Sequence, residues 1–194
     1  MSIIDDARHW LEITRAHGIV RRYFVVNGFD GALTMLGLII GFMVAGPADL
    51  SVIITACLGA AIALAVSGVS SAYVSESAER GRALAQLEQT MLTDLRESSH
   101  GRAARWVPLL IALTNGAAPF FVSLLIITPL WLSEHGVVSV AAPLPVAALT
   151  ALLAIFLLGV YLGHTTGTSW VRSGLRTMLI AVVTIVLIYV SASI

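Results

Sequence analysis

The chain has 194 residues, of which 58% are hydrophobic and only 11% are charged. Soluble domains carry about 25% charged residues, so this composition excludes an ordinary soluble domain and indicates an integral membrane protein. Arginine supplies all eleven positive charges, which balance eleven acidic residues, so we expect no basic surface for nucleic acid. The single cysteine, Cys57, excludes an intramolecular disulfide and argues against a thiol-based metal or redox site within one chain.

Residues 1–24 are expected to form an amphipathic helix that lies along the membrane surface. Trp10, Ile13 and His17 share one face of such a helix, and the charged residues lie elsewhere. The segment lacks the charged and then apolar pattern of a signal peptide. We therefore expect the first spanning helix to direct membrane insertion.

Apolar runs dominate the rest of the chain, and about 20 apolar residues in a helix cross the bilayer core. We predict an all-α integral membrane protein with a five-helix transmembrane domain over residues 25–194. The expected spans are approximately residues 25–45, 50–74, 106–132, 147–161 and 170–194. In the third span, Asn115-Gly116 and Pro119 are expected to loosen the helix and free backbone carbonyls.

The chain becomes polar over residues 75–105, between the second and third spans. Its apolar residues recur at spacings of three and four: Leu84, Leu87, Met91 and Leu95. This pattern predicts an amphipathic helix that continues the second span into water. We expect a short helix and a break at Gly101 to follow it.

All arginines fall on one side of the five-span arrangement. Four precede the first span, five lie in residues 75–105, and Arg172 and Arg176 lie at the entry to the last span. Cytoplasmic loops carry the excess of arginine, so this side is predicted to be cytoplasmic. We expect the N-terminus in the cytoplasm and the C-terminus outside, in the lipid of a prokaryotic plasma membrane.

The first span carries one carboxylate, Asp30. Its neighbours are polar or small: Asn27, Gly28 and Gly31. A charged acid costs about 2.5–3.5 kcal/mol at the centre of a membrane helix, so Asp30 needs a partner, a proton or an ion. The glycines thin the helix, so another helix or a hydrated cation can approach. The alternative is an interfacial acid that reaches water or pairs with Arg21 or Arg22.

Asn27 and Asp30 are therefore candidates for a metal or proton pathway, and two further side chains join them. Met35 follows in the first span, and Asn115 lies in the third. Each has an ordinary alternative, which is packing for Met35 and an interhelical hydrogen bond for Asn115. A GxxxG pattern in the first span also favours a helix contact: Gly37 and Gly41.

Glu76 and Glu79 share a helix face where the second span is expected to leave the membrane. With Glu88 they are candidates for a cytoplasmic metal entrance, since carboxylate oxygens suit Mn²⁺ or Fe²⁺. Weaker candidates follow in the same segment: Asp94, Glu97 and His100. The alternative is a solvated helix with two ion pairs: Glu76 with Arg80 and Glu79 with Arg82. No catalytic motif occurs, so we do not expect an enzyme.

Four stretches resemble the vacuolar iron transporter family. Residues 28–31 (GFDG) are similar to the signature that opens its first span, and residues 72–75 (AYVS) to the end of its second. Residues 115–132 resemble its proline-bearing third span, and residues 169–176 (SWVRSGLR) its entry to the fifth. The resemblance covers nearly the whole chain, in order.

The resemblance implies a homodimeric carrier that exports Fe²⁺ or Mn²⁺ from the cytoplasm by proton exchange and serves metal ion homeostasis. The metal is its substrate, with no permanently bound cofactor. The family's first-span aspartate falls on Asp30, its pathway lies between the first spans of two protomers, and cytoplasmic carboxylates collect the metal. Such a dimer also suits the chemistry, because a divalent cation takes about six oxygen ligands and a two-fold axis doubles Asp30.

The chain departs from the family in its second span. Where the family has a methionine and a glutamate, the sequence has Gly68 and Ala72. These residues predict a roomier and less charged site. A carrier of another solute with the same fold is therefore one alternative. A second is a non-transporting membrane scaffold, in which Asp30 pairs with an arginine.

Overall fold

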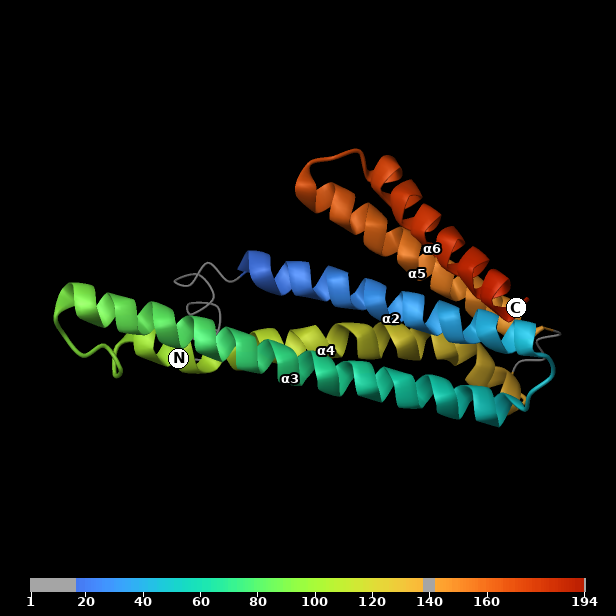
Figure 1. Ribbon diagram of the computed structural model, residues 1–194, viewed down its shortest axis with the longest axis horizontal. Coiled ribbons are helices and arrows are strands. Elements are labelled where there is room, and N and C mark those ends of the chain that lie inside the picture. The colour runs from blue at the N-terminus through green and yellow to red at the C-terminus, as the bar shows by residue number, and fades with distance from the viewer. Residues whose placement is uncertain (1–16, 138–141, 194) are drawn as a thin grey trace. The chain divides into compact units, whose positions relative to one another are not determined.

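The structure, a computed structural model, describes residues 17–137 and 142–193. Within these ranges it has five helices and no strand: α2 (His17–Ala45), α3 (Leu50–Met91), α4 (Ser99–Glu134), α5 (Pro143–Thr166) and α6 (Trp170–Ala192) (Figure 1). All five are long and apolar enough to cross a membrane, which confirms the all-α membrane fold. Most of the expected N-terminal amphipathic helix, residues 1–16, lies outside the described residues.

Helices α2, α3, α4 and α5 extend beyond the apolar runs that predicted them. The 42 residues of α3 continue past residue 74 through the polar segment to Met91. At 1.5 Å per residue this helix is about 63 Å long, roughly twice the thickness of the hydrocarbon core. The polar part is rich in Ala, Leu, Glu, Gln and Arg, which are strong helix formers, so the helix has no reason to stop. The expected helical extension of the second span is confirmed.

The expected break in α4 at Gly101 is wrong. Gly101 lies in the first turn of this helix, where a Cβ atom would collide with the carbonyl oxygens of Leu95 and Arg96. Glycine is needed there because the preceding loop passes directly over the turn. Helix α4 runs without a break to Glu134, also through Asn115-Gly116 and Pro119, where the sequence predicted a loosened helix.

The connection between α5 and α6 is shorter than the sequence predicted. Helix α5 continues through Thr166, whereas the sequence predicted the fourth span to end near residue 161. It ends at Gly167, whose left-handed backbone (φ 70°) lets its N–H donate to the carbonyl of Gly163. The hydroxyl of Thr166 donates to the carbonyl of Leu162 at 2.9 Å and so satisfies another terminal carbonyl.

The chain divides into two compact units. The first, called the polar unit below, comprises residues 1–24 and 65–117. The second, called the apolar unit, comprises residues 25–64 and 118–194. The polar unit has a small core of fully buried residues from α4, packed against the beginning of α2: Ala103, Val107 and Ile111 against Ile19, Val20 and Tyr23.

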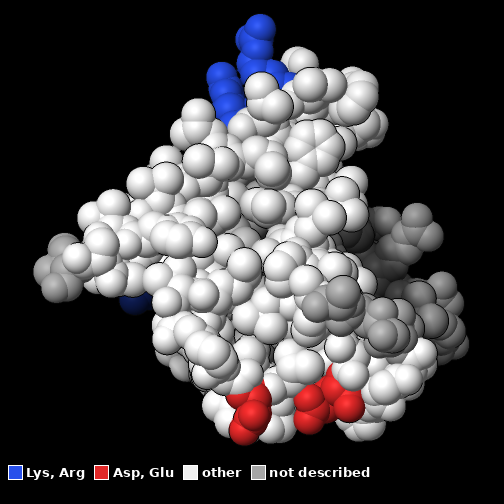
Figure 2. All heavy atoms as spheres, turned by 90° about the vertical axis from the view of Figure 1, so that its right-hand side faces the viewer, with Lys and Arg blue, Asp and Glu red and all other residues white. Residues whose placement is uncertain are grey.

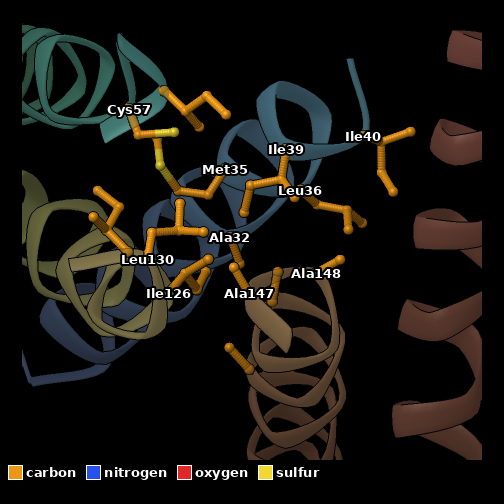
Figure 3. Packing of buried hydrophobic residues seen from close by; sticks show 14 of the residues in the cluster. Ala32, Met35, Leu36, Ile39, Ile40, Cys57, Ile126, Leu130, Ala147 and Ala148 are labelled. Carbon is orange, nitrogen blue, oxygen red and sulfur yellow. The ribbon is translucent and has the colours of Figure 1, made fainter. Parts of the chain in front are cut away.

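The core of the apolar unit brings together residues of all five helices described, and Figure 3 shows it from close by. Its fully buried members include Met35 and Ile39 of α2, Cys57 of α3, Leu130 of α4 and small residues of α5 such as Ala147. Small residues let the helix backbones approach closely, which is how membrane helices gain packing energy.

Helix α6 lies beside α5 (Figure 1) and buries only Gly174 and Ala181 completely. Figure 2 shows one end of the molecule, where a few acidic side chains gather at one edge and a few basic ones at the opposite edge. Residues other than Lys, Arg, Asp and Glu make up most of the described surface between them.

Candidate functional site

Asp30 faces away from the core of the apolar unit. Gly28 and Gly31, its neighbours on α2, are buried on the opposite side of the helix, whereas Asp30 itself is exposed. A Cβ atom at Gly31 would lie 2.8 Å from the Cα and carbonyl oxygen of Pro119 in α4. One at Gly28 would lie 3.5 Å from Leu158 in α5. The glycines therefore admit other helices, and this packing fixes the rotation of α2 that turns Asp30 outward.

No described residue forms an ion pair with Asp30. Arg22, eight positions earlier, lies about 12 Å back along the axis of α2, because each helical residue adds 1.5 Å. Its guanidinium lies instead over the ring of Tyr23, 5.7 Å from the ring centroid. The structure thus gives no support to the alternative in which Asp30 is half of an ion pair with Arg21 or Arg22.

Asp30 stands at the edge of a half-open cavity of about 200 Å³ between α2, α5 and α6. Its walls are almost entirely apolar and include Phe29, Leu162 and Ile180. Among the described residues of the lining, Thr177 alone carries a hydroxyl. This hydroxyl is within donating distance of two carbonyl oxygens, that of Gly174 at 2.8 Å and that of Ile155 at 3.2 Å. Asp30 is therefore the one ionisable group in the lining of this cavity.

The sequence did not indicate this cavity, because its two sides lie more than a hundred residues apart in the chain. The contact that shapes it is a close approach of α5 and α6, where Cβ atoms at Gly159 and Gly174 would meet Thr177 and Phe156. The only sequence signal was the spacing of these glycines. Without knowing which helices are neighbours, that spacing does not identify a cavity.

Met35 is fully buried in the core of the apolar unit, and Figure 3 shows its side chain directed toward Cys57. This position agrees with packing as the role of Met35. Asn27 is half-buried on the same helix. Neither residue lines the cavity beside Asp30.

Asn115 forms an interhelical hydrogen bond, which was the predicted alternative to a place in the metal or proton pathway. Its side-chain amide donates to the carbonyl oxygen of Gly68 at 2.7 Å. A Cβ atom at Gly68 would lie 3.1 Å from the carbonyl oxygen of Asn115 and 3.2 Å from the Cα of Gly116. Ala72 is buried, with 4% of its surface exposed. The expectation of a roomier site at Gly68 and Ala72 is wrong at Gly68, because the backbone of α4 fills that space.

Glu76 and Glu79 have different environments although both belong to α3. Glu76 is only 8% exposed and pairs with Arg80 at 3.7 Å, as the ion-pair alternative predicted. Its Oε2 atom accepts no hydrogen bond from the described residues. Glu79 is exposed, and within the described part of the chain it forms no ion pair with Arg82.

The remaining acidic candidates shape the loop between α3 and α4. Glu88 accepts the backbone N–H of Leu95 at 3.0 Å, and Asp94 accepts that of Arg96 at 2.8 Å. Glu97 forms a solvent-exposed pair with Arg105 at 3.8 Å. His100 is exposed in the first turn of α4. Across residues 17–137 and 142–193, no three His, Cys, Asp or Glu side chains gather as a metal site would require.

Comparison with known proteins gives one relative and no named function. The uncharacterized protein MJ0645 of Methanocaldococcus jannaschii is 31% identical over 158 residues, which cover 80% of this chain and 79% of the archaeal protein. No family model matches the chain. No solved structure matches it either.

Proposed function

We propose that this chain, which belongs to the same protein family as the Methanocaldococcus jannaschii protein MJ0645, exports a divalent cation, Fe²⁺ or Mn²⁺, in exchange for protons. The proposal includes a prokaryotic plasma membrane with the N-terminus in the cytoplasm. The observation that carries it is Asp30, a carboxylate in a spanning helix that faces outward without an ion pair among the described residues. Ionisable residues inside membrane helices are costly and mark ion or proton pathways.

A homodimer supplies what one protomer lacks. One carboxylate offers two oxygens, whereas hard divalent cations take about six ligands. Asp30, Gly37 and Gly41 lie on one face of α2, because they are separated by seven and four residues. The described residues cover little of that face at the two glycines, since a Cβ atom at Gly41 meets none of them within 4 Å and one at Gly37 meets only Ile188, at 3.9 Å. Two α2 helices in contact there bring two Asp30 carboxylates to one site.

At the cytoplasmic entrance, Glu76 and Glu79 have unequal roles in this proposal. Arg80 already neutralises Glu76, so a metal ion has to displace the guanidinium before it binds that carboxylate. Glu79 is exposed and carries no such competitor among the described residues. Glu79 is therefore the first carboxylate that an incoming cation meets.

Reconstitution in proteoliposomes tests this function. Mn²⁺ or Fe²⁺ flux, followed with an entrapped metal-sensitive dye under an imposed pH gradient, is expected for the parental protein. Asp30→Asn removes the charge but keeps the shape, so flux should fall at least tenfold while the thermal midpoint stays nearly unchanged. Asp49→Asn is the matched control, because Asp49 is exposed in the turn between α2 and α3. Parental flux through Asp30→Asn would exclude Asp30 from the pathway.

The direction of export depends on orientation, which the arginine distribution predicts. A reporter fused after Ile194 should be active outside the cytoplasm, and one inserted beside Gln89 should be active inside. Alkaline phosphatase and green fluorescent protein fusions report the two sides. Finding both positions on the same side would contradict the five-span arrangement.

A further inference from the structure

We propose that the cavity beside Asp30 binds a small organic ammonium ion with an apolar body. The ammonium group pairs with the Asp30 carboxylate, and the body occupies the space between α2, α5 and α6. This binding does not depend on metal transport, although both ligands meet at Asp30.

The size and lining of the cavity define the apolar part of the ligand. An apolar cavity of about 150 Å³ lined by Leu, Ile and Phe accommodates benzene. The cavity beside Asp30 is slightly larger, about 200 Å³, and Phe29, Leu158, Leu162 and Ile180 contribute to its walls. A phenyl ring or a short alkyl chain therefore fits it. A polar body does not, because the only hydroxyl in the lining already donates to backbone carbonyls.

The single carboxylate defines the charged part of the ligand. Within one protomer Asp30 has no ion-pair partner among the described residues, and a charge in an apolar setting is stabilised mainly by an opposite charge in direct contact. A divalent metal is poorly served by one carboxylate, since it loses most of its water without replacement ligands. A primary ammonium ion donates three hydrogen bonds and can keep part of its hydration through the open side of the cavity.

Two sources can supply such an ammonium group: a free amine and the ethanolamine headgroup of a phospholipid. Both present a primary ammonium group next to an apolar body. The volume of the cavity suits the free amine, because a diacyl lipid can place only a fraction of its apolar part there. The two sources are separated by changing either the added amine or the lipid.

The test measures thermal unfolding of the metal-free full chain in phosphatidylcholine nanodiscs with benzylammonium chloride. A ligand that binds only the folded state raises the midpoint. We expect a midpoint that rises with benzylammonium concentration and much less with benzyl alcohol, which has the same ring but no charge. If nanodiscs that contain phosphatidylethanolamine reproduce the rise without added amine, and Asp30→Asn abolishes it, the lipid is the source.

Two variants separate the charged and the apolar parts of the site. Asp30→Asn should abolish the benzylammonium effect, and Val26→Trp should do so by filling the cavity. Val52→Trp is the matched control, because Val52 is as exposed as Val26 (53% against 50%) but does not line the cavity. The proposal would be overturned if benzylammonium left the midpoint of the parental protein unchanged. It would also be overturned if the midpoints of Asp30→Asn and Val26→Trp rose as much as the parental one. Because no metal is present, these results are independent of the transport assay.

Discussion

The polar and the apolar units treat their acidic side chains in opposite ways. In the polar unit, Glu76 pairs with Arg80, and Glu88 and Asp94 accept backbone N–H groups. In the apolar unit, the acid inside a spanning helix, Asp30, has no ion pair among the described residues. An acid whose partner lies in its own unit contributes to folding, whereas an acid without one inside an apolar spanning segment requires a cation or a proton from elsewhere.

The two units also differ in what holds them together. In the apolar unit, glycines bring helices into backbone contact, as at Gly31 and Pro119. The polar unit combines such contacts with an ion pair and loop hydrogen bonds from charged side chains. Removing one feature at a time from each unit tests this difference, and the largest loss of stability is expected where backbone packs against backbone.

Gly31→Ala should cause the largest loss, about 3 kcal/mol of unfolding free energy, at the upper end of the usual cost of overpacking. The new Cβ atom would lie 2.8 Å from the backbone of Pro119, which cannot rotate away as a side chain can. Gly59→Ala is the control, because it adds the same atom to an exposed position of α3 in the same unit, where a Cβ atom meets nothing within 4 Å. Unfolding in detergent measures both. Equal stability of the two variants would contradict the packing of α2 against α4.

Glu76→Gln should cost about 1–2 kcal/mol, between the values for an exposed and a buried ion pair. The side chains of Glu76 and Arg80 are 10% and 15% exposed, so the pair is largely shielded from water. Glu79→Gln, three residues further along α3, removes an exposed charge that has no ion pair in the described residues and should leave stability unchanged. The same unfolding assay compares the two. A larger loss of stability in Glu79→Gln than in Glu76→Gln would contradict the stabilising role of the pair between Glu76 and Arg80.

Glu88→Ala should have the smallest effect, about 1 kcal/mol, the usual net value of one hydrogen bond. The variant leaves the N–H of Leu95 without the carboxylate that accepts it at 3.0 Å. Hydrogen exchange should accelerate at the amide of Leu95 and remain unchanged in the middle of α4. Gln89→Ala, at the exposed next position, is the control. Faster exchange in both variants would show that the loop frays for another reason.

The number of spanning helices was predictable because apolar composition alone determines it. The continuation of α3 to Met91 was predictable as well, since Leu84 and Leu87 kept the helical spacing. The expected break in α4 at Gly101 was wrong, for a physical reason that applies at Gly116 as well. Gly101 and Gly116 are consistent with turns in isolation, yet in the structure they make room for a neighbouring backbone or side chain, and no single segment reveals its neighbour.

The candidate site was predictable only in part. A carboxylate in an apolar run identified Asp30 without any structure, because its cost in the membrane is a property of the residue. The direction in which it faces depends on Pro119 and Leu158, which lie far along the chain. Glu88 and Asp94 were considered for a metal entrance because of their charge, but their hydrogen bonds belong to a loop whose geometry the helical pattern did not contain.

The small buried area of α6 has a consequence for the synthesis of the protein. Apart from Gly174 and Ala181, this helix is exposed or half-buried, so the described residues of this chain leave most of its surface uncovered. Only residues 167–169 separate it from α5, and threonine hydroxyls near that turn bond the last carbonyls of α5. Helices that are stable in lipid on their own can insert before they associate. The α5–α6 hairpin can therefore enter the bilayer as a pair before it packs against the helices that precede it in the chain.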